Sequence, residues 1–271
     1  MASLTPWRFT LCFAVVLFLA SFHASADLGQ VIPIGDLERW AAFSLGSEGS
    51  GNRLSDNTFV EGDFGAAGNG NITMTDDSTI NGDVYYRSNG TLAVAPGATI
   101  TGSVFNNQNS LLDNGVSEAM AASNAAAAFQ STRSLSEVNG EGTQNIVLSG
   151  APGETVVLNL RKFQLNGDST LTLQGSANTT YIINVKNQFS LSGNARIVLA
   201  GGLDWNDVLF NVRGKGSEVR LSGNSRFEGI LLANKRTVRL RDQAIVRGEV
   251  IGGRLAFQGT SQVIHPPVVS P

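Results

Sequence analysis

Apolar and polar residues alternate in short runs along most of the chain, and these runs repeat. The segments 219–227 and 238–246 align at a step of nineteen residues, which places Arg220 on Arg239. A glycine after an extended apolar–polar pair recurs at steps of twenty, at Gly62, Gly82 and Gly102. Such alternation is typical of β-strands with one buried side. The chain is therefore predicted to consist of short, repeated strands.

A second sequence motif predicts a strand, a tight turn and another strand. It begins at Phe163, Phe189, Val219 and Val238, with a degenerate copy at Leu255. Its Gly-Asn or Gly-Asp pair supplies the positive φ that a sharp corner requires. A repeat near twenty residues predicts stacked coils that bury their apolar sides against one another. We predict an all-β solenoid, a right-handed β-helix. A β-sandwich is the alternative, and the matching offsets of the corners count against it.

One segment departs from this pattern and predicts an α-helix over about residues 113–134. Alanine replaces β-branched residues there, and Asp113 or Ser117 provides a start signal. An apolar stripe at helical spacing is expected to face inward, and it consists of Ala119, Ala122, Ala126 and Phe129. We expect this helix to pack along the wall of the solenoid.

The chain begins with a short basic stretch, an apolar run and the small residues Ala24-Ser25-Ala26. This order predicts a signal peptide over residues 1–26 and a single β-helix domain over 27–271. Cys12 lies in the predicted signal peptide, so no disulfide is expected in the mature chain. No membrane span is expected in the mature chain either, because no further long apolar run follows. We expect a secreted or extracellular protein, with association with the cell envelope as a further expectation.

The remaining composition argues against catalysis. His265 would be the only histidine after removal of the signal peptide, which leaves no base for a histidine-dependent triad and no multi-histidine metal site. The close acidic pairs, Asp76 with Asp77 and Asp204 with Asp207, lie in turn-like sequence, where aspartate caps its own backbone. We expect no catalytic residue, no cofactor, no metal ion and no enzymatic activity.

Charge is distributed unevenly along the chain. Residues 27–143 hold fourteen acidic and four basic residues, a net charge of −10, whereas residues 144–271 hold eight acidic and fourteen basic residues, a net charge of +6. Coils stacked in chain order would have an acidic end and a basic end, which favours head-to-tail self-association. Without interleaved aromatic residues, the basic half is not expected to bind nucleic acid.

Arginine and lysine gather in the nineteen-residue repeat and form a predicted basic stripe. Guanidinium groups suit the carboxylates and phosphates of an anionic polysaccharide or cell-envelope polymer. Glu228 falls beside Arg247 at the repeat offset and relieves part of this charge. A solvated polar face is the alternative interpretation. The stripe consists of Arg220, Arg239, Arg241, Lys235 and Arg236.

Threonine forms a rival surface through Thr-x-Thr pairs, whose side chains share one side of a strand. Thr79 and Thr99 are twenty residues apart and could lie in one rank. A flat array of hydroxyl and methyl groups could order water and bind ice, although threonine is also an ordinary strand residue. The predicted set consists of Thr73, Thr75, Thr79, Thr99, Thr101, Thr170 and Thr172.

The succession of "GDLERWAAFSL", "VEGDFGAAGNG", the alanine-rich segment, "GLDWNDVLFNV" and "RFEGILLAN" resembles the choice-of-anchor A domain of exported bacterial proteins. The same succession is similar to the microbial ice-binding family. Either resemblance implies a right-handed β-helix with a wall helix. We expect a non-enzymatic exported surface or matrix protein for adhesion or anionic polysaccharide binding, and ice binding through the threonines is the alternative. The absence of a hydrophobic segment near Pro271 argues against covalent anchoring.

Overall fold

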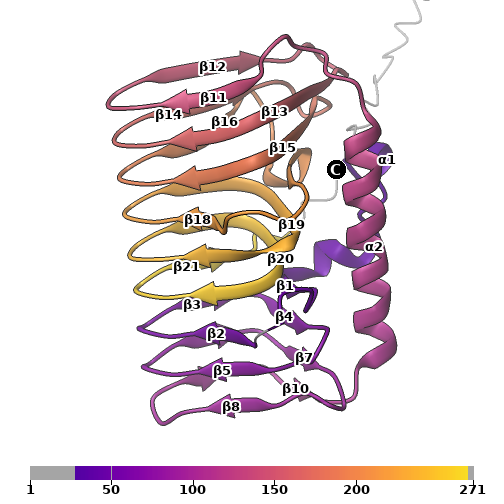
Figure 1. Cartoon of the computed structure of the whole chain (residues 1–271), viewed down its shortest axis with the longest axis vertical. Helices are drawn as coiled ribbons and strands as arrows, with labels where there is room; N and C mark the ends of the chain where they lie inside the picture. Colours follow the sequence, from indigo (N-terminus) through magenta and orange to yellow (C-terminus); the bar gives the residue numbers. More distant parts are fainter. Residues whose placement is uncertain (1–27, 50, 268–271) are drawn as a thin grey trace, which may run out of the picture.

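The computed structural model describes residues 28–49 and 51–267, and the predicted signal peptide lies outside them. The fold is all-β with few helices (Figure 1). Short helices α1 (Leu28–Val31) and η1 (Gly35–Arg39) precede the first strand, and a 3-10 helix, η2 (Trp205–Asp207), lies in the second half. Within the described residues, no helix has both the length and the apolar character needed to cross a bilayer.

The strands form parallel ladders in which each strand pairs with its counterpart one repeat further along. In the first half, Phe59 pairs with Thr79 and Thr79 with Thr99. These strands are β1 (Trp40–Ser44), β2 (Asn52–Leu54), β3 (Phe59–Glu61), β4 (Asp63–Ala66), β5 (Ile72–Met74), β6 (Thr79–Asn81), β7 (Val84–Tyr86), β8 (Leu92–Val94), β9 (Thr99–Ile100) and β10 (Val104–Phe105).

The second half builds larger coils, and some of its strands turn a corner without interruption. In β13 and β19 the register shifts where one ladder passes into the next. The strands are β11 (Glu137–Gly140), β12 (Asn145–Ser149), β13 (Thr155–Leu165), β14 (Thr170–Gln174), β15 (Thr180–Leu191), β16 (Arg196–Ala200), β17 (Val208–Val212), β18 (Val219–Leu221), β19 (Arg226–Leu240), β20 (Ile245–Phe257) and β21 (Gln262–Ile264).

Over the described residues, the pairings define three ladders, which we name by position. Ladder A contains β1, β4, β7, β10, β17, the first halves of β13 and β15, and the central parts of β19 and β20. Ladder B contains β2, β5, β8, β11, β18 and the last parts of β13, β15, β19 and β20. Ladder C contains β3, β6, β9, β12, β14, β16, β21 and the starts of β19 and β20.

The coils do not stack in chain order, which corrects the expectation of an acidic end and a basic end. The first coil lies on the last one: Ala42 pairs with Val250, and Val263 pairs with Val60 (Figure 1). The basic coils of the second half therefore lie in the middle of the stack. Residues 91–105, at one end of it, contain no charged residue. The stack therefore lacks the oppositely charged ends from which head-to-tail association was predicted.

Glycine recurs because the coils approach closely. A Cβ atom on Gly82 would lie 2.3 Å from the carbonyl oxygen of Gly62, so a side chain there would clash with the next coil. The corner glycines serve a different purpose: Gly193 has φ +71°, and Asp242 takes the same left-handed conformation at φ +61°. Asp76 and Asp77 also have positive φ, which confirms that they form a turn.

A long helix, α2 (Asn109–Ala128), runs along the side of the stack and connects its two ends (Figure 1). The predicted stripe is confirmed, because Ala119, Ala122 and Ala126 are fully buried and Phe129 is partly buried. The predicted bounds were wrong, since the helix begins at Asn109, before Asp113 and Ser117. Its N-cap residue, Gln108, makes no side-chain capping hydrogen bond, so no residue signals the start in the sequence.

Candidate functional site

Ladder C exposes a regular array of small side chains on β12, β14 and β16. Val147 pairs with Thr172, and Thr172 pairs with Val198, so three side chains form one row across neighbouring strands. Parallel rows lie on either side of it, Asn145 beside Thr170 and Ser149 beside Gln174 and Ala200. We call this surface the valine–threonine patch: Asn145, Val147, Ser149, Thr170, Thr172, Gln174, Val198 and Ala200.

The patch combines exposure with regular spacing. Val147 is 57% exposed and Val198 is 37% exposed, whereas the alternate residues Leu171, Leu173 and Ile197 are buried. Neighbouring strands lie about 4.8 Å apart, and outward residues repeat about every 6.6 Å along a strand. The sequences of β12, β14 and β16 contain one charged residue, Arg196, at the margin of the patch. The result is a nearly uncharged lattice of methyl, hydroxyl and amide groups.

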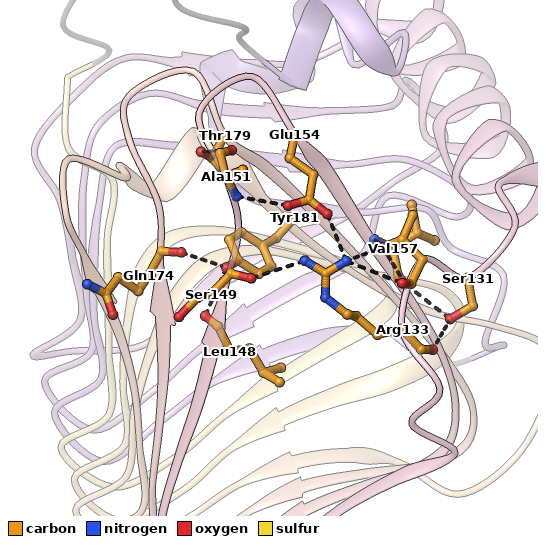
Figure 2. A network of polar contacts seen from close by, with 11 residues as sticks. Ser131, Arg133, Leu148, Ser149, Ala151, Glu154, Val157, Gln174, Thr179 and Tyr181 are labelled. Carbon is orange, nitrogen blue, oxygen red and sulfur yellow. Dashed lines mark hydrogen bonds and ion pairs between the residues drawn. The ribbon is translucent and has the colours of Figure 1, made fainter.

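A polar network fixes the ends of these strands (Figure 2). The Tyr181 hydroxyl lies 2.9 Å from the Leu148 carbonyl oxygen and 2.8 Å from that of Gln174, and can donate its hydrogen to either. Burial raises the pKa of Tyr181 to about 12, so the hydroxyl remains protonated. Arg133 donates to the Ser149 carbonyl at 3.1 Å and pairs with Glu154 at 2.7 Å. The segment after α2 thereby holds the strand ends of the patch in register.

The predicted threonines do not gather in one place. Thr170 and Thr172 lie in the patch, and Thr79 pairs with Thr99 as expected, but at the opposite end of ladder C. There, the Thr101 hydroxyl donates to Asn81 Oδ1 at 2.7 Å. Charged residues separate the two groups along the ladder: Arg226, Glu228, Arg247 and Glu61. Thr73 lies instead in ladder B and Thr75 at the corner after it.

The predicted stripe is only partly present. Arg220 pairs with Arg239 in register, and Glu228 pairs with Arg247, as expected. Glu218 neutralises much of the charge, since its carboxylate oxygens lie 2.5 and 2.8 Å from Arg239 nitrogens and 3.6 Å from Arg220. The hydrogen bond from Arg239 lowers the pKa of Glu218, which keeps the carboxylate charged.

Arg236 does not belong to the surface, and its inclusion in the stripe was wrong. The residue is 1% exposed. Its guanidinium donates to the carbonyl oxygens of Lys186 at 2.6 Å, Arg213 at 2.7 Å and Gly214 at 2.9 Å, and also contacts those of Asn187 and Ser217. Burial lowers the pKa of this guanidinium below its ordinary value. Arg236 is therefore an internal anchor that joins β15 to the segment between β17 and β18.

The two remaining stripe residues lie apart from each other. Lys235 is exposed where ladder A passes into ladder B, and Arg241 is exposed at the other edge of ladder B, where the chain turns toward ladder C. The basic residues therefore do not form one contact surface. Asp204 and Asp207 also have the structural role expected of them, because they form a capping box around η2.

A second cluster of basic residues was missed. Arg161, Lys186, Arg213, Lys215 and Lys235 line a cleft between α2 and the corner where ladder A passes into ladder B. The sequence carries a signal for it in "NLR", "NVK" and "NVR", where Asn159, Asn184 and Asn211 each precede a basic residue by two positions. These three short motifs are 25 and 27 residues apart, so they fall outside the nineteen- and twenty-residue repeats.

Comparisons with known proteins agree with this fold. A model of the ice-binding-like family matches residues 48–261. An ice-binding protein of Leucosporidium sp. (strain AY30) is 28% identical over 120 residues, which is 44% of either chain. The fold is similar to a glycosylated ice-binding protein (LeIBP) from Arctic yeast, with 20% identity, TM-score 0.57 and coverage of 89% of this chain and 96% of the other.

A further solved structure, an ice-binding protein from an Antarctic Flavobacteriaceae bacterium, has 19% identity and TM-score 0.60, with coverage of 89% of this chain and 50% of the other. At such identities the structures establish similarity of fold alone. The family model, by contrast, spans most of the sequence, including both groups of coils and the helix between them. The chain belongs to the ice-binding-like family.

Proposed function

We propose that this protein is a secreted, non-enzymatic ice-binding protein, built as a right-handed β-helix, and that the valine–threonine patch contacts the ice. Membership of the ice-binding-like family supports the activity. We choose this surface because the strand register places Val147, Thr172 and Val198 in one exposed row. The same family membership agrees with a protein that acts outside the cell.

The patch has suitable chemistry for a crystalline water surface. Rows of methyl groups keep neighbouring water in an ordered arrangement, while threonine hydroxyls and asparagine amides supply hydrogen bonds at fixed positions. The repeat of about 4.8 by 6.6 Å is set by the sheet and does not depend on flexible side chains. Rigid presentation matters because a surface that must order itself first loses affinity.

The adhesion function expected from the basic stripe lacks comparable support. Arg236 is buried, Arg239 is bound to Glu218, and Lys235 lies away from Arg241. The resemblance to the choice-of-anchor A domain remains a similarity of short sequence motifs. Ice is therefore the partner that we propose in place of an envelope polymer contacted by the stripe.

Thr172→Tyr tests the patch because it places a bulky ring in the central row. We expect this variant to lose most of the thermal hysteresis and of the inhibition of ice recrystallisation, since the ring separates the flat surface from the ice. Thr79→Tyr introduces the same side chain at the other end of ladder C and should retain both activities. Circular dichroism would verify that both variants fold.

The reverse result, loss with Thr79→Tyr alone, would move the site to the row of Thr79 and Thr99. Retention of activity by both variants would reject ladder C as the contact surface. Absence of both activities in the unmodified chain would reject ice binding itself.

A further inference from the structure

The basic cleft, lined by Arg161, Lys186, Arg213, Lys215 and Lys235, has a volume of about 810 Å³. It lies on the side of the molecule that carries α2, and no residue of the valine–threonine patch lines it. A cleft of this size can enclose several sugar units or a similar ligand. A ligand in this cleft would therefore leave the valine–threonine patch uncovered.

Successive coils supply the cations in order. Asn159 pairs with Asn184, and Asn184 pairs with Asn211, so the basic residues two positions further on lie at corresponding places on three coils. Neighbouring strands are about 4.8 Å apart, and the charges follow this spacing approximately. The cleft thus presents a row of positive charges, which suits a linear ligand with regularly spaced negative groups.

The backbone beneath the cleft is held rigidly by Arg236. Its guanidinium donates to the carbonyl oxygen of Lys186 in β15 and to those of Arg213 and Gly214 in the segment after β17, which also carries Lys215. These partners are uncharged, so the buried guanidinium adds its positive charge to the field in the cleft. These hydrogen bonds connect β15 to the segment after β17 without any ligand.

Little internal compensation exists for this charge. Arg161 pairs with Glu137 at 2.8 Å. Among the residues that the structure describes, no carboxylate forms an ion pair with Lys186, Arg213, Lys215 or Lys235. All four side chains belong to exposed residues. Like charges placed this close repel one another unless an anion binds between them.

Amide groups provide the second kind of contact. Asn124 of α2 and Asn187 of β15 are exposed at the cleft, and Asn159 of β13 also lines it. An amide can both donate a hydrogen bond and accept one, which suits the hydroxyl groups of a sugar. Cations alone would select any anion, whereas cations with amides favour an anionic ligand that also carries hydroxyls.

We propose that the basic cleft binds an acidic oligosaccharide, with its carboxylate or sulfate groups on the lysine and arginine side chains and its hydroxyls on the asparagine amides. The site is distinct from the dispersed stripe, from which it retains only Lys235. It is also independent of the proposed ice-binding surface.

Isothermal titration calorimetry of the chain from residue 27 tests the proposal. The probes are an oligogalacturonate, a sulfated heparin oligosaccharide, a neutral malto-oligosaccharide of equal length and inorganic sulfate. We expect at least one acidic oligosaccharide to bind, with an affinity that falls as salt rises, and the neutral one not to bind. Comparison of the two acidic probes shows whether carboxylate or sulfate is preferred.

The triple variant Lys186→Gln, Lys215→Gln, Lys235→Gln should weaken this binding at least about tenfold, a loss of about 1.4 kcal/mol. The control Arg196→Gln, Arg226→Gln, Arg247→Gln removes equal charge from ladder C and should retain binding. Equal weakening in both variants, binding of inorganic sulfate alone, or binding of no probe would overturn the proposal. Thermal hysteresis should be unchanged in the cleft variant, so failure here is distinguishable from failure of ice binding.

Discussion

Among single residues, Glu249 and His265 form a buried pair that no function described above uses. Glu249 is fully buried, and its Oε1 lies 3.5 Å from Nε2 of His265, which packs against Trp205. Neither of these two atoms has a hydrogen-bond partner within the described residues. Burial, with a smaller effect of Glu38, raises the pKa of Glu249 well above its ordinary 4.5. Burial also lowers the pKa of His265 below 6.5, against the opposing effect of Asp63.

These shifts predict how stability depends on pH. Because the pKa of Glu249 is raised in the folded state, its contribution is fully present below pH 4.5 and is lost as pH rises toward the folded pKa. Glu249→Gln removes this loss. We expect the free energy of unfolding of the variant to exceed that of the original chain increasingly above pH 5, by up to about 1.4 kcal/mol per pH unit. Urea unfolding between pH 4 and 8 measures the difference.

The titration of His265 predicts a separate change in stability at acidic pH. Since its pKa is lowered in the folded state, its stabilising contribution is present above pH 6.5 and is lost as pH falls through the folded pKa. Glu249→Gln should therefore leave a decline in stability on acidification. Parallel curves for the variant and the original chain between pH 5 and 8 would mean that Glu249 is ionised in the folded protein.

At the scale of elements, the attachment of α2 to ladder A combines small residues with a buried polar row. Asn184 donates to the Ala126 carbonyl at 2.8 Å, and Asn211 donates to that of Ser123 at 3.0 Å. The Ser123 hydroxyl in turn donates to Asn211 Oδ1 at 2.7 Å. These hydrogen bonds fix where the helix lies along the sheet, while its alanines allow a close approach.

This close approach predicts a large difference between two neighbouring alanines. Ala122 is fully buried against ladder A, whereas Ala121 is exposed. Ala122→Leu should lower the free energy of unfolding by about 1–3 kcal/mol because the added carbons cannot fit. Ala121→Leu, the matched control, should change it by less than about 0.5 kcal/mol. Similar effects in urea unfolding of the two variants would contradict a tightly packed helix.

The elements themselves were predictable to different degrees. The alternation around Phe163 and Phe189 identified paired strands, and the two residues are partners in the structure, with ring centroids 5.0 Å apart. The alanine stripe identified the buried side of α2. Its start was not predictable, because packing rather than a capping residue determines it. The burial of Arg236 was also hidden, since its partners are backbone carbonyls supplied by other coils.

At the scale of the whole molecule, the order of the coils follows from contacts that no local pattern encodes. Steps of twenty residues in the first half and of 17 to 30 residues in the second specify which coil follows within each half, and those neighbours were predictable. The junction joins the two halves through the pairs Ala42 with Val250 and Leu54 with Phe257, which are far apart in sequence. The valine–threonine patch depends only indirectly on the junction between the halves, because β12, β14 and β16 lie on consecutive coils of the second half.

The buried junction predicts that both halves unfold together. Trp40 belongs to the first coil and Trp205 to the second half, and both are buried. In Trp205→Phe, starting at residue 27, fluorescence reports the first coil while far-ultraviolet circular dichroism reports all strands. The two urea transitions should coincide. Val60→Asp, which buries a carboxylate at the junction, should lower both midpoints together because each half loses the surface on which it rests. A shift of the fluorescence transition alone would mean that the halves are independent, and that the second half supports its coils without the first.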